Sequence, residues 1–206
     1  MSRITAKLWI TDELSVFDFD KTQPHLVSSI FPKIYQSNVS TLKLCNQIIS
    51  YSEYLIFSSN VQNILLDYIT VQNVDGSIVS LEKLFKSLSK IKSFFMYDSP
   101  ACSGITSNTF KELLKLQHFS KIDKFVLGDI SEIFVIDSFF TYVKKNKHTK
   151  FSLWFNNSIS AGFKNRLEAI VDEIIETKTR NYKSPIICFP GIDYEKREKM
   201  ISFYRS

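Results

Sequence analysis

The sequence predicts an α/β fold in which short parallel strands alternate with helices to form a solenoid. Short apolar segments recur along the chain, and stretches with helical periodicity lie between them, which is the order expected of a parallel sheet with crossover helices. The first apolar residues of six such segments lie 22 to 34 residues apart, a range that suits degenerate structural repeats. A hydrophobic content of 44% supplies the side chains that such a core requires.

Each expected strand is a short run of the form L-x-L, followed by a polar or small residue. Because successive side chains of a strand point to opposite faces, this spacing places both apolar residues on the same face. The six runs occupy residues 6–10, 41–46, 63–67, 93–97, 124–128 and 150–155. A seventh strand at residues 185–189 is expected to end the sheet.

Apolar residues at helical spacing predict the connecting helices. The clearest pattern covers residues 163–177, where Leu167, Ile170 and Ile174 share one apolar stripe. The other helices are expected at residues 24–35, 80–88, 107–116 and 136–143. Pro32 lies within the first of these, so that helix has to bend or begin late.

Several segments also fit the leucine-rich-repeat spacing L-x-x-L-x-L when other apolar residues are accepted, as Val39, Leu42 and Leu44 show. In that template an asparagine follows and satisfies backbone groups in the turn after the strand. Asn156 matches it in the last unit, and other residues mostly replace it elsewhere. The fold class predicted is therefore a leucine-rich-repeat-like α/β solenoid.

Residues 1–192 are expected to form one α/β repeat domain, and residues 193–206 a charged C-terminal tail that is a short helix or frayed. Residues 1–13 contain no apolar run of signal length, and the chain has no uncharged apolar run of about 18 residues, so neither a secretory signal nor a membrane span is predicted. Three widely spaced cysteines indicate reduced thiols. These features favour a cytoplasmic or nuclear location.

The net charge of +5 is distributed unevenly along the chain. Residues 144–206 hold 13 basic and 7 acidic side chains, a balance of +6, whereas residues 1–143 hold 13 basic and 14 acidic ones. A basic region of this kind is typical of contact with nucleic acid, an anionic lipid or an acidic protein, but a solvated basic face is the favoured interpretation. The expected contact residues are Lys144, Lys145, Lys147 and Lys150.

A family resemblance is carried by three runs: LKLQHFSKIDKF (114–125), FFTYVKKNKHTK (139–150) and KNRLEAIVDEIIET (164–177). They resemble a large nematode family of F-box-associated, leucine-rich-repeat-like proteins, over about residues 60–195. In that family an F-box precedes the repeats and docks a ubiquitin-ligase adaptor, and the repeats capture a substrate. The residues before the first expected strand show no F-box pattern, so the resemblance implies the substrate-recognition part.

The sharpest enzyme pattern is the pair Asp18 and Asp20 in VFDFDKT (16–22). Such a D-x-D after an apolar strand is typical of phosphatase-like hydrolases, in which the first aspartate is the nucleophile. The residues before Asp18 look like a poor buried strand, and Gln23 stands where a glycine is usual. A surface edge or loop is the favoured interpretation of these carboxylates.

Other reactive groups are sparse. The chain has three cysteines and three histidines with no pair at zinc-ligand spacing, and it lacks the glycine-rich motifs of dinucleotide and P-loop sites. Cys102 lies in an expected loop where His118 or His148 could activate it, but a small residue in a turn is the favoured interpretation. No metal and no cofactor are predicted.

These observations lead to one main functional prediction and two alternatives. The main prediction is a non-catalytic protein-interaction module that binds a protein partner, with the resemblance implying substrate recognition for a ubiquitin ligase. The alternatives are a nucleic-acid-binding protein that uses the basic last third of the chain, and a phosphatase-like hydrolase that uses Asp18 and Asp20.

Overall fold

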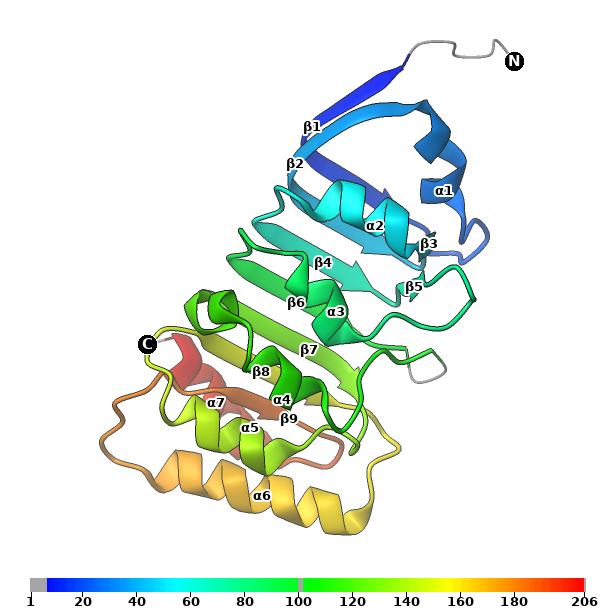
Figure 1. Cartoon of the computed structure of the whole chain (residues 1–206). Helices are drawn as coiled ribbons and strands as arrows, with labels where there is room; N and C mark the ends of the chain where they lie inside the picture. The colour runs from blue at the N-terminus through cyan, green and yellow to red at the C-terminus, as the bar shows by residue number, and fades with distance from the viewer. Residues whose placement is uncertain (1–6, 100–101, 206) are drawn as a thin grey trace.

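The fold is built on a parallel sheet of seven strands, seen in a computed structural model that describes residues 7–99 and 102–205 (Figure 1). The order of the strands in this sheet is the same as their order along the chain. The strands are β1 (Leu8–Phe17), β2 (Ile34–Cys45), β4 (Asn63–Asp67), β6 (Ser93–Tyr97), β7 (Lys124–Ile130), β8 (Lys150–Phe155) and β9 (Ile186–Cys188). The mixed α/β class with a parallel sheet is thus confirmed.

Helices α1 to α6 lie on one face of the sheet (Figure 1). A strand order that never reverses requires this, because crossovers between parallel strands are right-handed and each must therefore return on the same side. These helices are α1 (Leu26–Ile30), α2 (Tyr51–Ser58), α3 (Leu81–Lys86), α4 (Thr109–Leu113), α5 (Ile136–Val143) and α6 (Ala161–Glu176). Short 3-10 turns at Phe31–Lys33 and Gln117–Lys121 complete this layer.

A second, two-stranded parallel sheet pairs β3 (Ile48–Ser50) with β5 (Thr70–Gln72). Each of these strands follows a strand of the main sheet after a two-residue turn. The turn residues Asn46 and Tyr68 have φ angles of 52°, in the left-handed region that redirects the chain. The strands β3 and β5 therefore pair side by side just as β2 and β4 do, at the start of the segments that lead to the next strands of the main sheet.

The core between the sheet and the helices is one apolar cluster, with a stack of phenylalanine rings over β6, β7 and β8. Phe94, Phe125 and Phe151 occupy matching positions on three neighbouring strands, with ring centroids 5.5 Å and 6.2 Å apart. Phe85 of α3 and Phe139 of α5 pack on them from the helix side. All five rings are fully buried, so the high phenylalanine content serves packing here.

The first strand is longer than the sequence predicted. The strand expected at residues 6–10 begins at Leu8 among the described residues and runs to Phe17, through a register shift at Asp12, where φ is 60°. Beyond this bulge, Leu14 and Val16 alternate into the core. The residues before Asp18 therefore do form a strand, although only Leu14 and Val16 of it are buried, and the bulge interrupts the alternation that the sequence pattern requires.

Two further segments differ from the expected elements. The helix expected at residues 24–35 ends as α1 at Ile30, passes through the 3-10 turn that contains Pro32, and gives way to β2 at Ile34. Residues 193–206, expected as a charged tail, contain α7 (Tyr194–Arg205), which packs against α6 and β9 and buries Met200 completely. A helix in this segment is thus confirmed, and it is packed onto the sheet.

Candidate interaction surface

The second face of the sheet is exposed over β2, β4 and β6. On β4, Ile64 and Leu66 are buried under the helices, whereas Asn63 and Leu65 point to the other side. No described helix crosses this side over those three strands, and α7 lies at the other end of the sheet, against β9 and the first residues of β7 and β8. We call this exposed side the open face.

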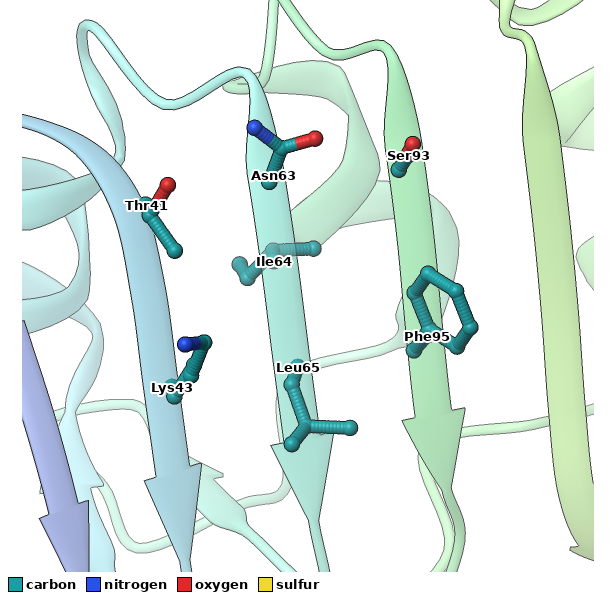
Figure 2. Close-up of a pocket in the computed structure, with 7 residues that line it drawn as sticks. All are labelled: Thr41, Lys43, Asn63, Ile64, Leu65, Ser93 and Phe95. Carbon is teal, nitrogen blue, oxygen red and sulfur yellow. The ribbon is translucent and has the colours of Figure 1, made fainter. Parts of the chain in front are cut away.

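The open face is hollowed into a pocket of about 310 Å³, shown in Figure 2. Two rows of side chains run across the strands here, because matching residues lie beside one another in the register. The first row is polar, and the second combines a cation with two apolar groups. The rows are Thr41, Asn63 and Ser93, followed by Lys43, Leu65 and Phe95.

Charged side chains border the pocket at both ends of the second row. Lys43 forms an ion pair of 2.8 Å with Glu13 on β1, and hydrogen bonds from Lys43 and Ser15 hold the pKa of Glu13 below its usual value. The ammonium of Lys124 on β7 lies 4.7 Å from the centre of the Phe95 ring. Leu65 and Phe95 are thus half-buried apolar groups between two lysines, an arrangement that can contact both apolar and acidic groups of a partner.

Helix α7 borders the open face at the end of the sheet formed by β8 and β9. Lys150 donates from Nζ to the carbonyl oxygen of Tyr204 at 2.9 Å, and both Lys124 and Lys150 lie over the Tyr204 ring. Arg197 lies over Trp154 of β8 at 5.6 Å. Lys124 and Lys150 belong to the same cross-strand row as Ser93, so the polar row of the pocket continues into a basic region under α7.

The four lysines expected to form one contact patch are separated by the fold. Lys144 ends α5 on the helix side, where it pairs with Glu173 of α6 at 2.9 Å and lies over the Phe140 ring. Lys150 begins β8 on the open face. Lys145 and Lys147 are exposed in the turn between them, and the structure assigns neither of them an ion-pair partner within the described residues.

Asp18 and Asp20, the expected catalytic pair, lie in the turn after β1. The preceding strand that a phosphatase-like motif requires is present. However, Asp18 is buried and both carboxylate oxygens accept backbone N–H groups, from Thr22 at 3.1 Å and Gln23 at 2.7 Å. Asp20 is exposed, and no cluster of three or more His, Cys, Asp or Glu side chains suited to a metal is found in residues 7–99 and 102–205. These bonds give Asp18 a structural role in closing the turn.

In the turns after other strands, polar side chains also form hydrogen bonds with the backbone. Gln47 is fully buried after β2, accepts from the Val27 backbone N–H at 3.0 Å and donates to the Gln23 carbonyl. Asn156 after β8 donates to the Asp129 carbonyl at 3.2 Å. Gln47 stands three residues after Leu44, at the position that the leucine-rich-repeat template gives to asparagine. The sequence therefore indicates this turn if glutamine is accepted in place of asparagine.

Asp98 follows β6, and its buried carboxyl group has a strongly raised pKa. Burial raises its pKa to about 6, in opposition to hydrogen bonds from the Ser103 hydroxyl and from backbone N–H groups. The cause of the raised pKa is therefore burial, and the carboxylate of Asp98 also accepts a hydrogen bond from the Ser103 hydroxyl. No sequence pattern marked this residue.

The histidines do not serve Cys102. His118 stacks on Phe85 with centroids 5.2 Å apart and its Nε2 lies 3.0 Å from the Phe85 carbonyl oxygen. His148 pairs with Asp123 at 2.9 Å. Both imidazoles thus have other partners, and Cys102 is half-buried in its loop.

Comparisons with models of known protein families, with curated proteins and with solved structures gave no match to this chain. Among the helices of the described residues, none combines the length and the apolar composition that crossing a membrane requires.

Proposed function

We propose that this chain is a non-catalytic protein-interaction module that binds a protein partner across the open face. The observation that carries the proposal is the asymmetry of the sheet, with one face covered by six helices and the other exposed over three strands. An exposed sheet face with half-buried apolar groups and flanking charges has the composition of a recognition surface.

We also propose that the architecture is a leucine-rich-repeat-like solenoid. Support comes from turns that recur with the strands: the residue after β2 and the residue after β4 share a left-handed backbone, and each donates its N–H to the next strand. The bonds run from Asn46 to the Asp67 carbonyl at 2.9 Å and from Tyr68 to the Tyr97 carbonyl at 3.0 Å. Stacked repeats of this kind present extended binding surfaces.

The nematode F-box-associated family suggests a specific role for such a module. We propose, on that resemblance, that the partner is a substrate presented to a ubiquitin ligase. Nucleic-acid binding stays the second candidate, and the lysines that favour it are Lys124 and Lys150, which lie together under α7.

The test compares two variants that carry the same change on opposite sides of the molecule. Leu65→Asp places a carboxylate in the pocket of the open face, and Leu114→Asp places one on the helix side, where Leu114 is 44% exposed. Both tagged variants and the unaltered chain are used for affinity purification with nuclease present, and captured proteins are identified by mass spectrometry.

The proposal expects one set of proteins to be captured by the unaltered chain and by Leu114→Asp, and to be lost with Leu65→Asp. Circular dichroism melts of all three proteins check that the folds are equal. Capture that survives Leu65→Asp argues against the open face, and partners that disappear with nuclease favour nucleic acid instead.

A further inference from the structure

A second pocket, of about 330 Å³, lies at the basic end of the open face. It is formed where the loop before β9 and the end of α7 meet the start of β8. Its polar and charged lining residues are Lys150, Arg180, Tyr182, Lys183, Ser184 and Tyr204. Its volume is at the lower end of the range for small-ligand sites, so it suits a single chemical group better than a large molecule.

Two buried hydroxyl groups of residues that line this pocket have no hydrogen-bond partner in the part of the chain that the structure describes. Ser184 is only 5% exposed, and its Oγ has no partner among the described residues. The phenol oxygen of Tyr204 is also buried and unpartnered within that part of the chain. Buried polar groups in proteins are normally hydrogen-bonded, so these two hydroxyls can bond a ligand once their side chains turn toward the pocket.

The charges of the pocket define what that group is. Three of the lining side chains, Lys150, Arg180 and Lys183, are cationic, and none of its lining residues is acidic. Arg180 is held in place by hydrogen bonds to the Ile174 carbonyl and by stacking over Phe203 at 4.1 Å. Lys150 is likewise held by the Tyr204 carbonyl, so two of the three cations are positioned before any ligand arrives.

We infer that this pocket binds the phosphate group of a phosphorylated side chain on the protein partner. A phosphate monoester offers a charge near −2 and three free oxygens, which match three cations and two unpaired hydroxyls better than the single charge and two oxygens of a carboxylate. The assignment to a side chain of the partner rests on the proposed function, because the pocket continues from the open face through Lys124 and Lys150.

The pocket is tested without any partner, so that its failure is distinct from failure of the open-face proposal. The probes are N-acetyl phosphoserine amide, N-acetyl phosphotyrosine amide and inorganic phosphate, titrated into the full chain by isothermal calorimetry or by NMR. Lys183→Gln and Ser184→Ala remove one charge and one unpaired hydroxyl. Lys178→Gln is the matched control, because Lys178 is exposed in the same loop and does not line the pocket.

The expected result is saturable binding of a blocked phosphoamino acid, weakened about tenfold by Lys183→Gln or Ser184→Ala and less than about twofold by Lys178→Gln. Ser184→Ala should not lower the melting temperature, because it removes a group that is unpaired in the free protein. Leu65→Asp should leave this binding intact even though it disrupts partner capture.

Three results would overturn the inference. The first is an absence of saturable binding in the unaltered chain. The second is binding by Lys183→Gln and Ser184→Ala that is as tight as that of the unaltered chain. The third is tighter binding of inorganic phosphate than of either phosphoamino acid. Tighter binding of a single-stranded DNA oligonucleotide, weakened by the same variants, would instead assign the pocket to a nucleic-acid backbone.

Discussion

The two faces of the sheet are made by alternate residues of the same strands, yet they differ in almost every property. On β6, Phe94 is fully buried and stacks on Phe125, whereas its neighbour Phe95 is half-buried and carries the ammonium of Lys124 over its ring. The helix-covered face is a continuous apolar layer, aliphatic over β1, β2 and β4 and aromatic over β6 to β8, and the open face is a mosaic of polar, apolar and basic groups.

This difference shows how one short strand can serve two purposes. The apolar positions of the L-x-L pattern fix the core, and the residue between them is free to determine what the open face recognises. A change on one face should therefore alter stability, and a change on the other should alter binding. Variants on the two faces can test this separation.

Adjacent phenylalanines on β6 give the sharpest test. Phe94→Ala should lower the free energy of unfolding by about 3–5 kcal/mol, because it leaves a cavity inside the ring stack. Phe95→Ala should cost about 1 kcal/mol or less, since its ring is already partly in contact with solvent. Urea unfolding followed by circular dichroism measures both values. Similar losses for the two variants would show that the open face is packed as tightly as the core.

The next effect comes from Asp98, whose carboxyl has a pKa of about 6 in the folded chain because it is buried, against 3.8 for the ordinary group. The folded state therefore holds this proton more tightly than the unfolded state does. Stability from this group is fully present below pH 3.8 and is lost as the pH rises through about 6, by up to about 3 kcal/mol.

Asp98→Asn removes this titration, so it isolates the effect from other carboxyl groups. The stability of the unaltered chain relative to Asp98→Asn should rise when the pH falls from 7 to 4, as measured by urea midpoints at both values. If the difference in stability between the two proteins is the same at pH 4 and pH 7, the Asp98 carboxyl does not cause the pH dependence.

A smaller effect is expected at Gly128, a local exception to this separation, because the Tyr97 ring packs directly against its backbone. A β-carbon at Gly128 would lie 2.3 Å from Cδ1 of the Tyr97 ring, so Gly128→Ala forces that ring to move. We expect a loss of about 1–3 kcal/mol in unfolding free energy. The loss should shrink when Tyr97→Ala is combined with it, because the obstructing ring is gone; additive losses in this double-mutant cycle would refute the contact as the cause.

The sequence was informative about the helix-covered face because the apolar residues of that face recur at regular spacing. All seven main strands and most helices were predicted from apolar spacing alone, although the bulge at Asp12 hid the second part of β1. Helix α2 was missed because Leu55 and Ile56 are exposed, which blurs its apolar stripe. Its start was nonetheless marked by a capping box between Ser50 and Glu53, a local signal that does not depend on periodicity.

The candidate site was much less predictable, for a physical reason. The open-face residues Asn63 and Ser93 are 30 positions apart in the chain and become neighbours only through the strand register, which the sequence does not state. The lysines suggested a patch because they are close in sequence. However, Lys144 ends a helix and Lys150 begins a strand, so the fold directs them to different sides.

The smallest effect is therefore expected at Lys145 and Lys147, two of the four lysines where the sequence placed the contacts. Double charge reversal, Lys145→Glu with Lys147→Glu, should change the affinity for the captured partner less than about twofold, because both side chains lie in the exposed turn between α5 and β8 and neither lines the pocket of the open face. The measurement is surface plasmon resonance with the partner identified by the capture experiment, and Leu65→Asp serves as the variant that should lose binding. If the double reversal abolishes binding and Leu65→Asp does not, recognition depends on the basic turn, and the separation of stability and binding between the two faces fails.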